Sequence, residues 1–544
     1  MIRTILLQAL AAIALAAGAS AQIGSWGTPS LHDESVGPGF VNPLTPSSSG
    51  ALFNAVHLAL IPQPTTREGL VLAWDRQDQV GTPAGWAQRW TVLDPSTNPP
   101  TVLWNDELMI AGRTSGDLFC SGHAWTPDGR LFVAGGTSAY SHGTLFGGAK
   151  LAFLYDPRPT TAAPYGTWTR LPDMAEDRWY PTVTTMADGK LMVSGGSHYD
   201  VKVNSYEVYD LTTQAWQTDA VSGNAWFPGP LGAASYSFSF YPRLHSLADG
   251  RLFMSGPKIY AGRLDHPAAP GVWDMTSTSS SDRHDGSSFL YPLGFGSPDA
   301  TVILGGSNIA TGHTTAHQTV EWCLPQSPSA SWTPGPSLAK PRVHLNTVVL
   351  PDATVLAIGG NAMVAGQMTY WRDAEWLDSS LTWKSMPDGA SDRDYHSTAV
   401  LLPDGRVLSA GGDHRNFDWQ RLVPPTYDDP AKPRPTGVTL PTTELEYWQV
   451  SQQLYTADFS LPPGRSISKV VLMVPGSVTH HSDFGQRYIE LPILAQTDGS
   501  VTFAPPYSAP NPAAPLNFTA PRGYAMLFLI SDQGIPSEGR FVRL

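Results

Sequence analysis

Five side chains in this sequence have types and spacing that could build a redox or metal site. Cys120 is one of only two cysteines in 544 residues, and Tyr180, Tyr241, His344 and His396 follow it. Each stands at the same offset before an aspartate in a Pro-Asp-Gly-like turn. If these turns join equivalent strands around one axis, the five side chains enter a central channel at equivalent heights. The pattern therefore indicates a ligand site at one end of that channel.

Imidazole nitrogens and phenolate oxygens together form a donor set that copper accepts in tetragonal geometry. Taken alone, each residue has a simpler interpretation. A tyrosine before a strand usually packs with its hydroxyl bonded, and a lone buried cysteine usually behaves as a small hydrophobic residue. A single histidine on a strand is more often a satisfied polar group than a ligand. The shared register argues against five independent coincidences.

Repeated β-hairpins are the elements that must position these residues. Asp-Gly between alternating apolar runs is a strong hairpin signal. The turn aspartates recur about every 50 to 60 residues, which is typical of the four-stranded blades of kelch-type propellers. The copies lie at 123–136, 180–196, 241–256, 288–306, 344–360 and 396–412, with a weaker copy at 57–74. The sequence therefore predicts an all-β fold with a seven-bladed kelch-like β-propeller.

A second domain is expected after the propeller. Proline cannot donate to a sheet ladder, so the proline-rich stretch at 424–435 predicts a boundary between a propeller over residues 22–430 and a C-terminal domain over 431–544. Short alternating strands are expected at 453–461, 468–473, 487–493, 501–504 and 524–531. Their length and spacing predict an antiparallel, immunoglobulin-like β-sandwich.

Charge and targeting signals restrict the environment and the partners. Arg3, an apolar run and Ala19-Ser20-Ala21 have the pattern of a signal peptide over residues 1–21. We therefore expect a secreted or periplasmic protein, and no later apolar run is long enough to span a membrane. A net charge of −13 disfavours nucleic acid and anionic membranes as partners. We expect a monomer acting on small molecules.

The ordered motifs resemble the copper radical oxidases, the galactose oxidase and glyoxal oxidase family. The segment Asp117-Leu118-Phe119-Cys120 resembles the family's cysteine segment, and Arg178-Trp179-Tyr180-Pro181 resembles its cross-linked tyrosine segment. Tyr395-His396 and Thr479-His480 resemble its remaining ligand segments. The resemblance implies one copper ion bound by Tyr180, Tyr395, His396 and His480, and a Cys120–Tyr180 thioether radical as a protein-derived cofactor. If His480 binds copper, the C-terminal domain must send this loop into the propeller channel.

The resemblance also implies a mechanism. Tyr395 would take the substrate's hydroxyl proton, the Tyr180 radical would abstract hydrogen from carbon, and O2 would be reduced to H2O2. The galactose oxidases place a tryptophan over the thioether at a position occupied here by His198, which resembles the glyoxal oxidase branch. His198 could instead only cap a blade loop. We expect a small aldehyde, as its hydrate, or a primary alcohol as substrate.

Several alternatives remain open at this stage. His481 competes with His480 as the ligand, and Tyr241 and Arg243 could line the mouth of the site. Cys323 is expected to be a free, buried thiol, because a disulfide with Cys120 would abolish the radical site. The chain could also be a galactose or alcohol oxidase of the same cofactor class, a non-catalytic kelch-like propeller that binds glycans or proteins, or a structural coat protein.

Overall fold

The computed structural model describes a nearly all-β molecule with one short helix, α2 (Trp448–Ser451), in the described part of the chain. The expected signal peptide lies outside the described residues. None of the described helices is long and apolar enough to cross a membrane. The described residues are 24–27, 30–31, 54–62, 69–75, 86–98, 100–110, 116–140, 146–199, 201–217, 238–265, 272–294, 297–309, 316–327, 329–413, 418–507 and 520–544.

Each of the seven expected hairpins lies in an antiparallel sheet of its own within these ranges. The first sheet contains β3 (His57–Leu60), β4 (Val71–Trp74), β5 (Trp86–Asp94) and β6 (Thr101–Ile110). The second contains β7 (Asp117–Trp125), β8 (Leu131–Tyr140), β9 (Phe146–Gly148), β10 (Ala152–Asp156) and β11 (Thr167–Arg170). The third contains β12 (Thr182–Thr185), β13 (Leu191–Ser194), β16 (Tyr206–Asp210) and β17 (Ala215–Gln217).

The fourth sheet contains β18 (Arg243–Ser246), β19 (Leu252–Gly256), β20 (Tyr260–Asp265) and β21 (Val272–Thr278). The fifth contains β22 (Ser287–Tyr291), β23 (Ala300–Leu304), β24 (Val320–Cys323) and β25 (Thr333–Pro334). The sixth contains β26 (Asn346–Val349), β27 (Val355–Ile358), β30 (Asp373–Leu377) and β31 (Trp383–Asp388). The last hairpin is β32 (Ser397–Leu401) and β33 (Val407–Gly411), joined by β34 (Asp418–Val423), β1 (Ser25–Trp26) and β2 (Ser30–Leu31). Two small ribbons pair β14 (Ser197–His198) with β15 (Val201–Lys202) and β28 (Asn361–Val364) with β29 (Gln367–Tyr370).

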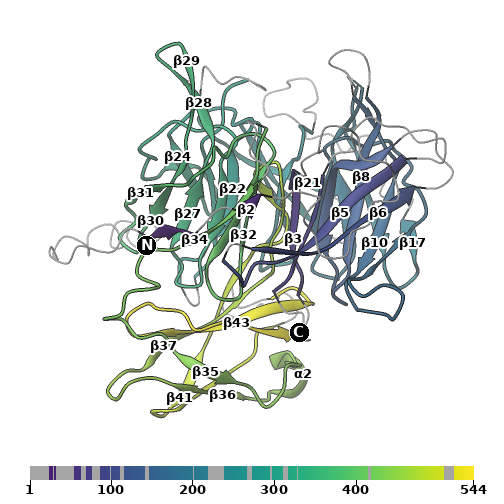
Figure 1. Cartoon of the computed structure of the whole chain (residues 1–544). Coiled ribbons are helices and arrows are strands. Elements are labelled where there is room, and N and C mark those ends of the chain that lie inside the picture. The colour runs from purple at the N-terminus through teal and green to yellow at the C-terminus, as the bar shows by residue number, and fades with distance from the viewer. Residues whose placement is uncertain are drawn as a thin grey trace.

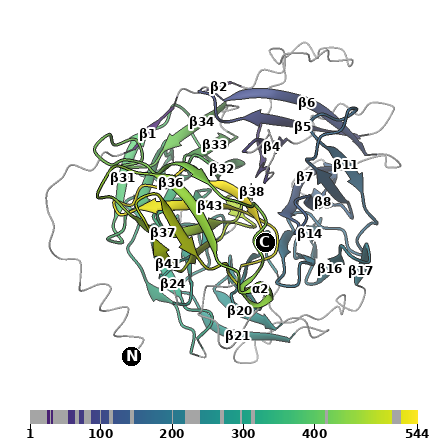
Figure 2. The ribbon, with the colours of Figure 1, turned by 90° about the horizontal axis from the view of Figure 1, so that it is seen from below.

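The first strand of each sheet lies nearest the centre of the molecule. These strands contact one another in chain order from β7 through β12, β18, β22 and β26 to β32, and β32 contacts β3. Figure 2 shows the sheets spread around this centre. Residues just before the first strands therefore come from distant parts of the sequence but lie close together.

Buried arginines anchor the loops that lead into four of these first strands. Each guanidinium pairs with a carboxylate on the third strand of its own sheet: Arg178 with Glu207 at 3.1 Å, Arg283 with Glu321 at 2.8 Å, Arg342 with Glu375 at 3.0 Å, and Arg393 with Asp418 at 2.8 Å. Removing one partner of such a buried pair typically costs about 3–5 kcal/mol, because the other charge stays buried and unpaired. The pairs therefore hold the ends of these loops rigidly.

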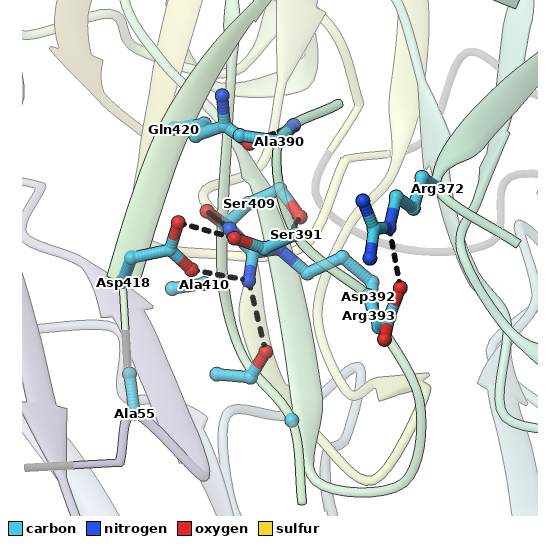
Figure 3. A network of polar contacts seen from close by, with 12 residues as sticks. Ala55, Arg372, Ala390, Ser391, Asp392, Arg393, Ser409, Ala410, Asp418 and Gln420 are labelled. Carbon is cyan, nitrogen blue, oxygen red and sulfur yellow. Dashed lines mark hydrogen bonds and ion pairs between the residues drawn. The ribbon is translucent and has the colours of Figure 1, made fainter. Parts of the chain in front are cut away.

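Arg393 illustrates how this anchoring reaches the centre of the molecule (Figure 3). Its Nη1 donates to Asp418 and to the carbonyl of Gly411 at 3.2 Å, while Ser391 Oγ donates to the other oxygen of Asp418 at 2.6 Å. Gly411 has a φ of 70°, and a Cβ there would lie 2.8 Å from the carbonyl oxygen of His396. The loop that carries Tyr395 and His396 is thus fixed from both sides.

The C-terminal region forms two packed four-stranded sheets, which agrees with the expected sandwich. One contains β35 (Thr436–Thr439), β36 (Tyr455–Ser460), β42 (Ser500–Phe503) and β41 (Ile493–Gln496), and the other contains β40 (Tyr488–Leu491), β37 (Ile467–Met473), β43 (Tyr524–Ser531) and β44 (Arg540–Arg543). Figure 1 shows these sheets beneath the others.

Strand β37 shows why the two regions pack together. Its side chains alternate between two apolar cores: Val470 and Leu472 face the sandwich interior, whereas Val471 and Met473 join the core of the neighbouring sheets. A strand that is buried on both faces reads as a continuous apolar run, as this one does. The C-terminal region also adds β38 (Ser477–Thr479) and β39 (Ser482–Asp483) to the sheet of β3, with Thr479 opposite His57.

The buried His123 and the partly buried His245 predict an acid-sensitive fold. Burial lowers the pKa of His123 and of His245 from 6.5 to about 3. Below pH 6.5 these histidines bind protons in the unfolded chain but stay neutral in the folded chain. The stability that the two neutral histidines contribute is therefore fully present above pH 6.5 and is lost as the pH falls toward 3. We expect the free energy of unfolding to fall by up to about 1.4 kcal/mol per pH unit for each histidine.

Denaturant unfolding between pH 7 and pH 4 measures this loss. His245→Gln should reduce the pH dependence of the free energy of unfolding by the contribution of one histidine, because glutamine does not titrate. The variant Lys432→Gln, in a partly exposed turn, serves as control and should keep the full pH dependence of the free energy of unfolding. An unchanged slope in His245→Gln would contradict the assignment.

Candidate metal centre

Four rings meet where the expected metal site should lie. Tyr180 precedes β12, Tyr395 and His396 precede β32, and His480 directly follows β38. The hydroxyl groups of Tyr180 and Tyr395 are hydrogen-bonded to each other. The His480 ring lies 4.6 Å from the His396 ring at 90°, 4.7 Å from Tyr180 and 5.3 Å from Tyr395, centroid to centroid. Segments that lie far apart in the sequence thus supply one cluster.

A shared backbone conformation aims these side chains inward. The residues at the common offset all have positive φ, a region that non-glycine residues rarely occupy: Cys120 (64°), Tyr180 (61°), Tyr241 (42°), His344 (60°) and His396 (67°). Neighbouring members are tied through the backbone, since Tyr180 N donates to Cys120 O at 3.0 Å and Tyr241 N donates to Tyr180 O at 2.9 Å. Backbone strain of this kind clusters at functional sites.

Cys120 and Tyr180 belong to one buried cluster. Cys120 is fully buried, and its Sγ lies 3.8 Å from Nε2 of His480. Burial raises the pKa of the Cys120 thiol well above its usual value, and a hydrogen bond from Tyr180 opposes this shift. Cys323 is a free, buried thiol at the end of β24, as expected, and burial raises its pKa to about 12.

Hydrogen bonds set the tautomer of both histidines that are expected to bind the metal. Nδ1 of His396 lies 2.6 Å from Oδ1 of Asp413, so it carries the proton and donates it to the carboxylate. The Thr479 hydroxyl donates to the carbonyl of Val56 at 2.8 Å, so it accepts from Nδ1 of His480 at 2.6 Å. Both Nε2 atoms therefore keep a lone pair, and Nε2 of His396 is buried without a hydrogen-bond partner among the described residues.

This donor set fits copper. Within the described ranges no three His, Cys, Asp or Glu side chains converge as a metal cluster, whereas two imidazole nitrogens and two phenol oxygens do. Burial raises the pKa of Tyr180 and of Tyr395 well above the usual value for a phenol. Nitrogen and oxygen donors of this kind suit tetragonal Cu(II). An orphaned, buried Nε2 beside two phenols is what a metal-binding site requires.

A second chain of imidazoles supports the backbone at Cys120. The Cys120 amide donates to Nε2 of His57 at 3.1 Å, so His57 holds its proton on Nδ1, 3.1 Å from Nε2 of His123. Nδ1 of His123 is hydrogen-bonded to the hydroxyl of Ser477 in β38. The Trp74 ring stacks on His57 at 4.6 Å. This chain ties the Cys120 loop to the C-terminal strand that brings in His480.

An open pocket of about 430 Å³ leads to the cluster. Tyr180, Tyr395 and His480 lie on its wall, together with Tyr241 and Arg243, which the sequence suggested as residues of the mouth. His481 also lines it, and its ring lies 5.2 Å from His344. A small molecule entering this pocket would therefore meet the two phenols and the His480 imidazole directly.

Comparisons with known proteins identify the family. Residues 107–427, more than half of the chain, match the family model described as glyoxal oxidase N-terminus. The chain belongs to the copper radical oxidases, the galactose oxidase and glyoxal oxidase family. Residues 434–544 match the galactose oxidase-like early set domain.

Two relatives support this membership, and one solved structure shares the fold. The galactose oxidase of Gibberella zeae is 25% identical over 517 residues, which cover 90% of this chain and 70% of the relative. The aldehyde oxidase GLOX of Vitis pseudoreticulata is 26% identical over 478 residues, covering 79% and 82%. A novel fungal alcohol oxidase of the AA5 family, solved in complex with copper, shares the fold with a TM-score of 0.72, 21% identity and coverage of 96% and 99%.

The stacking ring in this copper radical oxidase comes from an unexpected position. Trp179 stacks on Tyr180 at 3.8 Å and 21°, and Phe146 stacks on Trp179 at 4.8 Å. The His198 ring contacts Tyr199 at 4.4 Å, and its Nδ1 is buried without a hydrogen-bond partner in the described part of the chain. The left-handed conformation of Tyr180 allows adjacent rings to stack. The role of His198 at the thioether stays a prediction.

Asp413 gives the first prediction about the metal site. Asp413→Asn removes the charged acceptor that orients His396, so we expect copper affinity to fall about 10- to 100-fold, as for other outer partners of metal-binding histidines. A chelator-competition titration measures the change. Asp428→Asn is a matched control, because that carboxylate is equally exposed but pairs with Arg406. Equal affinities in the two variants would refute the assignment.

Proposed function

We propose that this protein is a secreted mononuclear copper radical oxidase that oxidises a small aldehyde, as its hydrate, or a primary alcohol with O2 and releases H2O2. The observation that carries the proposal is the convergence of two phenols and two correctly protonated imidazoles beside Cys120. In this proposal Tyr180, Tyr395, His396 and His480 hold one copper ion, and a thioether joins Cys120 to Tyr180.

The domain assignment is part of the same proposal. We take the seven hairpin-based sheets as the blades of one kelch-like propeller over residues 22–430, followed by an immunoglobulin-like domain over 431–544. Residues 1–21 act as the signal peptide, and the mature protein is a monomer. In a propeller, the first strand of each blade lines the axis, which matches the position of the site.

The chain's own residues perform the steps of the reaction. Copper, when bound, supplies one-electron redox chemistry, and the Cys120–Tyr180 unit supplies the second one-electron store. With copper bound, Tyr395 would be held as the phenolate, and its oxygen would accept the proton from the substrate's hydroxyl group, for which the two must lie within hydrogen-bond reach. The oxidised Tyr180 oxygen takes the hydrogen atom from the substrate carbon. The substrate loses two electrons and two protons, and O2 gains both to become H2O2.

Trp179 and the buried apolar cluster contribute shielding. The indole covers one face of the Tyr180 ring, which restricts access of water and of reductants to an oxidised ring. Phe240 lies edge-on to both rings at 5.2 and 5.3 Å. A protein that positions and protects a built-in redox group in this way does the work expected of an oxidase scaffold.

The pocket and the relatives support the proposed substrate class. The pocket suits a small molecule, and the family match is to glyoxal oxidase. A galactose or alcohol oxidase of the same cofactor class is the alternative, because one relative carries the name galactose oxidase. A non-catalytic, glycan-binding propeller is a further alternative, and it predicts an unmodified Cys120.

One experiment tests the proposal. The purified protein is loaded with copper under oxygen, and a tryptic map is searched for a thioether between the Cys120 and Tyr180 peptides. Peroxide release is then measured with methylglyoxal, glyoxal, glycerol and galactose. We expect the cross-link and peroxide from the small substrates. An unmodified Cys120 after full copper loading would contradict the proposal. Activity on galactose alone would instead indicate a sugar oxidase.

A further inference from the structure

Asp285 places a carboxylate in the wall of the pocket. It precedes β22 and has a φ of 56°, so it belongs to the same left-handed ring of residues as Cys120 and His396. About a quarter of its side chain (27%) is exposed, and it lines the pocket together with Tyr180 and Tyr395. The repeat offset missed Asp285 because the turn of this hairpin is longer.

The carboxylate oxygens of Asp285 lie next to two imidazoles, those of His344 and His481. Oδ2 is 3.8 Å from Nε2 of His344, and Oδ1 is 3.9 Å from Nε2 of His481. Both distances exceed the length of a hydrogen bond. The His344 ring in turn lies 4.9 Å from the Tyr395 ring. His344 is thus a neighbour of both Asp285 and Tyr395.

Arg243 fixes the loop that presents this carboxylate. Its Nη2 donates to the carbonyls of Arg283 at 3.0 Å and Gly286 at 2.6 Å, on either side of Asp285. Arg283 is held in turn by Glu321 at 2.8 Å. The guanidinium of Arg243 therefore acts as a positioning group for the loop, and Asp285 is rigid before a substrate arrives.

We propose that Asp285 selects the substrate: its carboxylate accepts a hydrogen bond from a hydroxyl on the carbon next to the reacting carbon, and it repels substrates that carry a carboxylate there. This inference rests on the proposed oxidase function. It names the preferred class as neutral molecules with neighbouring hydroxyl groups, such as vicinal diols and doubly hydrated dialdehydes.

The chemistry of the carboxylate and its place in the pocket lining both support this choice. An ionised carboxylate is an acceptor only, so it favours hydroxyl donors, and hydrogen bonds to a charged acceptor are roughly twice as strong as neutral ones. In this proposal a substrate hydroxyl on the reacting carbon meets Tyr395, and a hydroxyl on the next carbon meets Asp285, which lines the same pocket. The Arg243 guanidinium in the same pocket donates to the carbonyls of Arg283 and Gly286. An anionic group that lies next to Asp285 therefore meets a like charge at short range, which disfavours it.

Substrate pairs test the inference. We compare kcat/KM for glycerol against 1-propanol, and for glyoxal against glyoxylate, in the copper-loaded wild type, Asp285→Ala and Asp285→Asn. The glycerol-to-propanol ratio should fall at least about tenfold in Asp285→Ala, as expected for one lost charge-assisted hydrogen bond. The glyoxylate-to-glyoxal ratio should rise at least about tenfold in Asp285→Asn, which removes the charge but keeps the shape.

Controls separate the possible failures. Asp282→Asn changes a carboxylate in the same loop that pairs with Lys258 at 2.8 Å and lies outside the pocket lining, so both ratios should stay at the wild-type value. Equal copper content in all variants checks folding. An active wild type whose ratios do not change in either Asp285 variant overturns this inference alone. A copper-loaded wild type that yields no peroxide from any of the four substrates overturns the proposed function and this inference with it.

Discussion

Cys120→Ala should abolish both the covalent cofactor and the oxidase activity. Without Sγ no thioether can form on Tyr180, and an unsubstituted buried phenol is harder to oxidise. We expect kcat to fall by about three orders of magnitude, which corresponds to roughly 4 kcal/mol of lost transition-state stabilisation. Mass spectrometry after copper loading should show the wild type lighter than its sequence by two hydrogen atoms, and the variant at its full sequence mass.

Cys323→Ala is the matched control, because it removes the other buried, free thiol of the chain. That thiol lies on β24, in a separate apolar cluster with Phe253 and Leu290. The control should keep the mass loss and the peroxide release. Full activity in Cys120→Ala, or loss of the cross-link in Cys323→Ala, would contradict the assignment of the cofactor.

The hairpins could be predicted from sequence because their signals are local. Asp-Gly turns between alternating apolar runs specify both the strand pair and its register, and each expected pair appears, from β3–β4 to β32–β33. Cys120, Tyr180 and His396 also stand at the same number of residues before their turns, which correctly indicated that they lie at equivalent positions before the first strands. Local turn chemistry thus determines which residues share the axis.

Features that depend on tertiary contacts could not be predicted. The left-handed conformation of Tyr180 and the stacking of Trp179 follow from backbone ties to neighbouring sheets, which leave no local mark. Asp413 and Thr479 become visible as partners only when the histidine tautomers are assigned. The longer turn after β22 shifted Asp285 out of the repeat offset, so a chemically active position escaped the pattern.

The arrival of His480 at the centre is the clearest long-range effect. Strand β38 pairs with β3 across more than 400 positions of sequence, since Thr479 lies opposite His57. The resemblance to the family named His480, but only strand pairing explains how a C-terminal residue reaches the other expected ligands. The same pairing links the two regions of the chain to one function.

His480→Gln should lower copper affinity by more than about 100-fold, beyond the effect of losing an outer partner. The physical reason is position: the His480 ring lies within 4.6 to 5.3 Å of the rings of His396, Tyr180 and Tyr395, and Thr479 directs its Nε2 toward them. Copper affinity from chelator competition, with the EPR spectrum of the loaded protein, measures the loss of one nitrogen ligand.

His481→Gln is the decisive comparison, because the two histidines are adjacent in sequence. Both have left-handed φ, 46° for His480 and 56° for His481, so their rings do not alternate as in a strand. The His481 ring lies 6.3 Å from Tyr395 and turns toward His344 and Asp285. This variant should therefore bind copper with the wild-type EPR spectrum. If His481→Gln lost copper and His480→Gln retained it, the ligand would be His481, and the loop after β38 would have to rearrange when the metal binds.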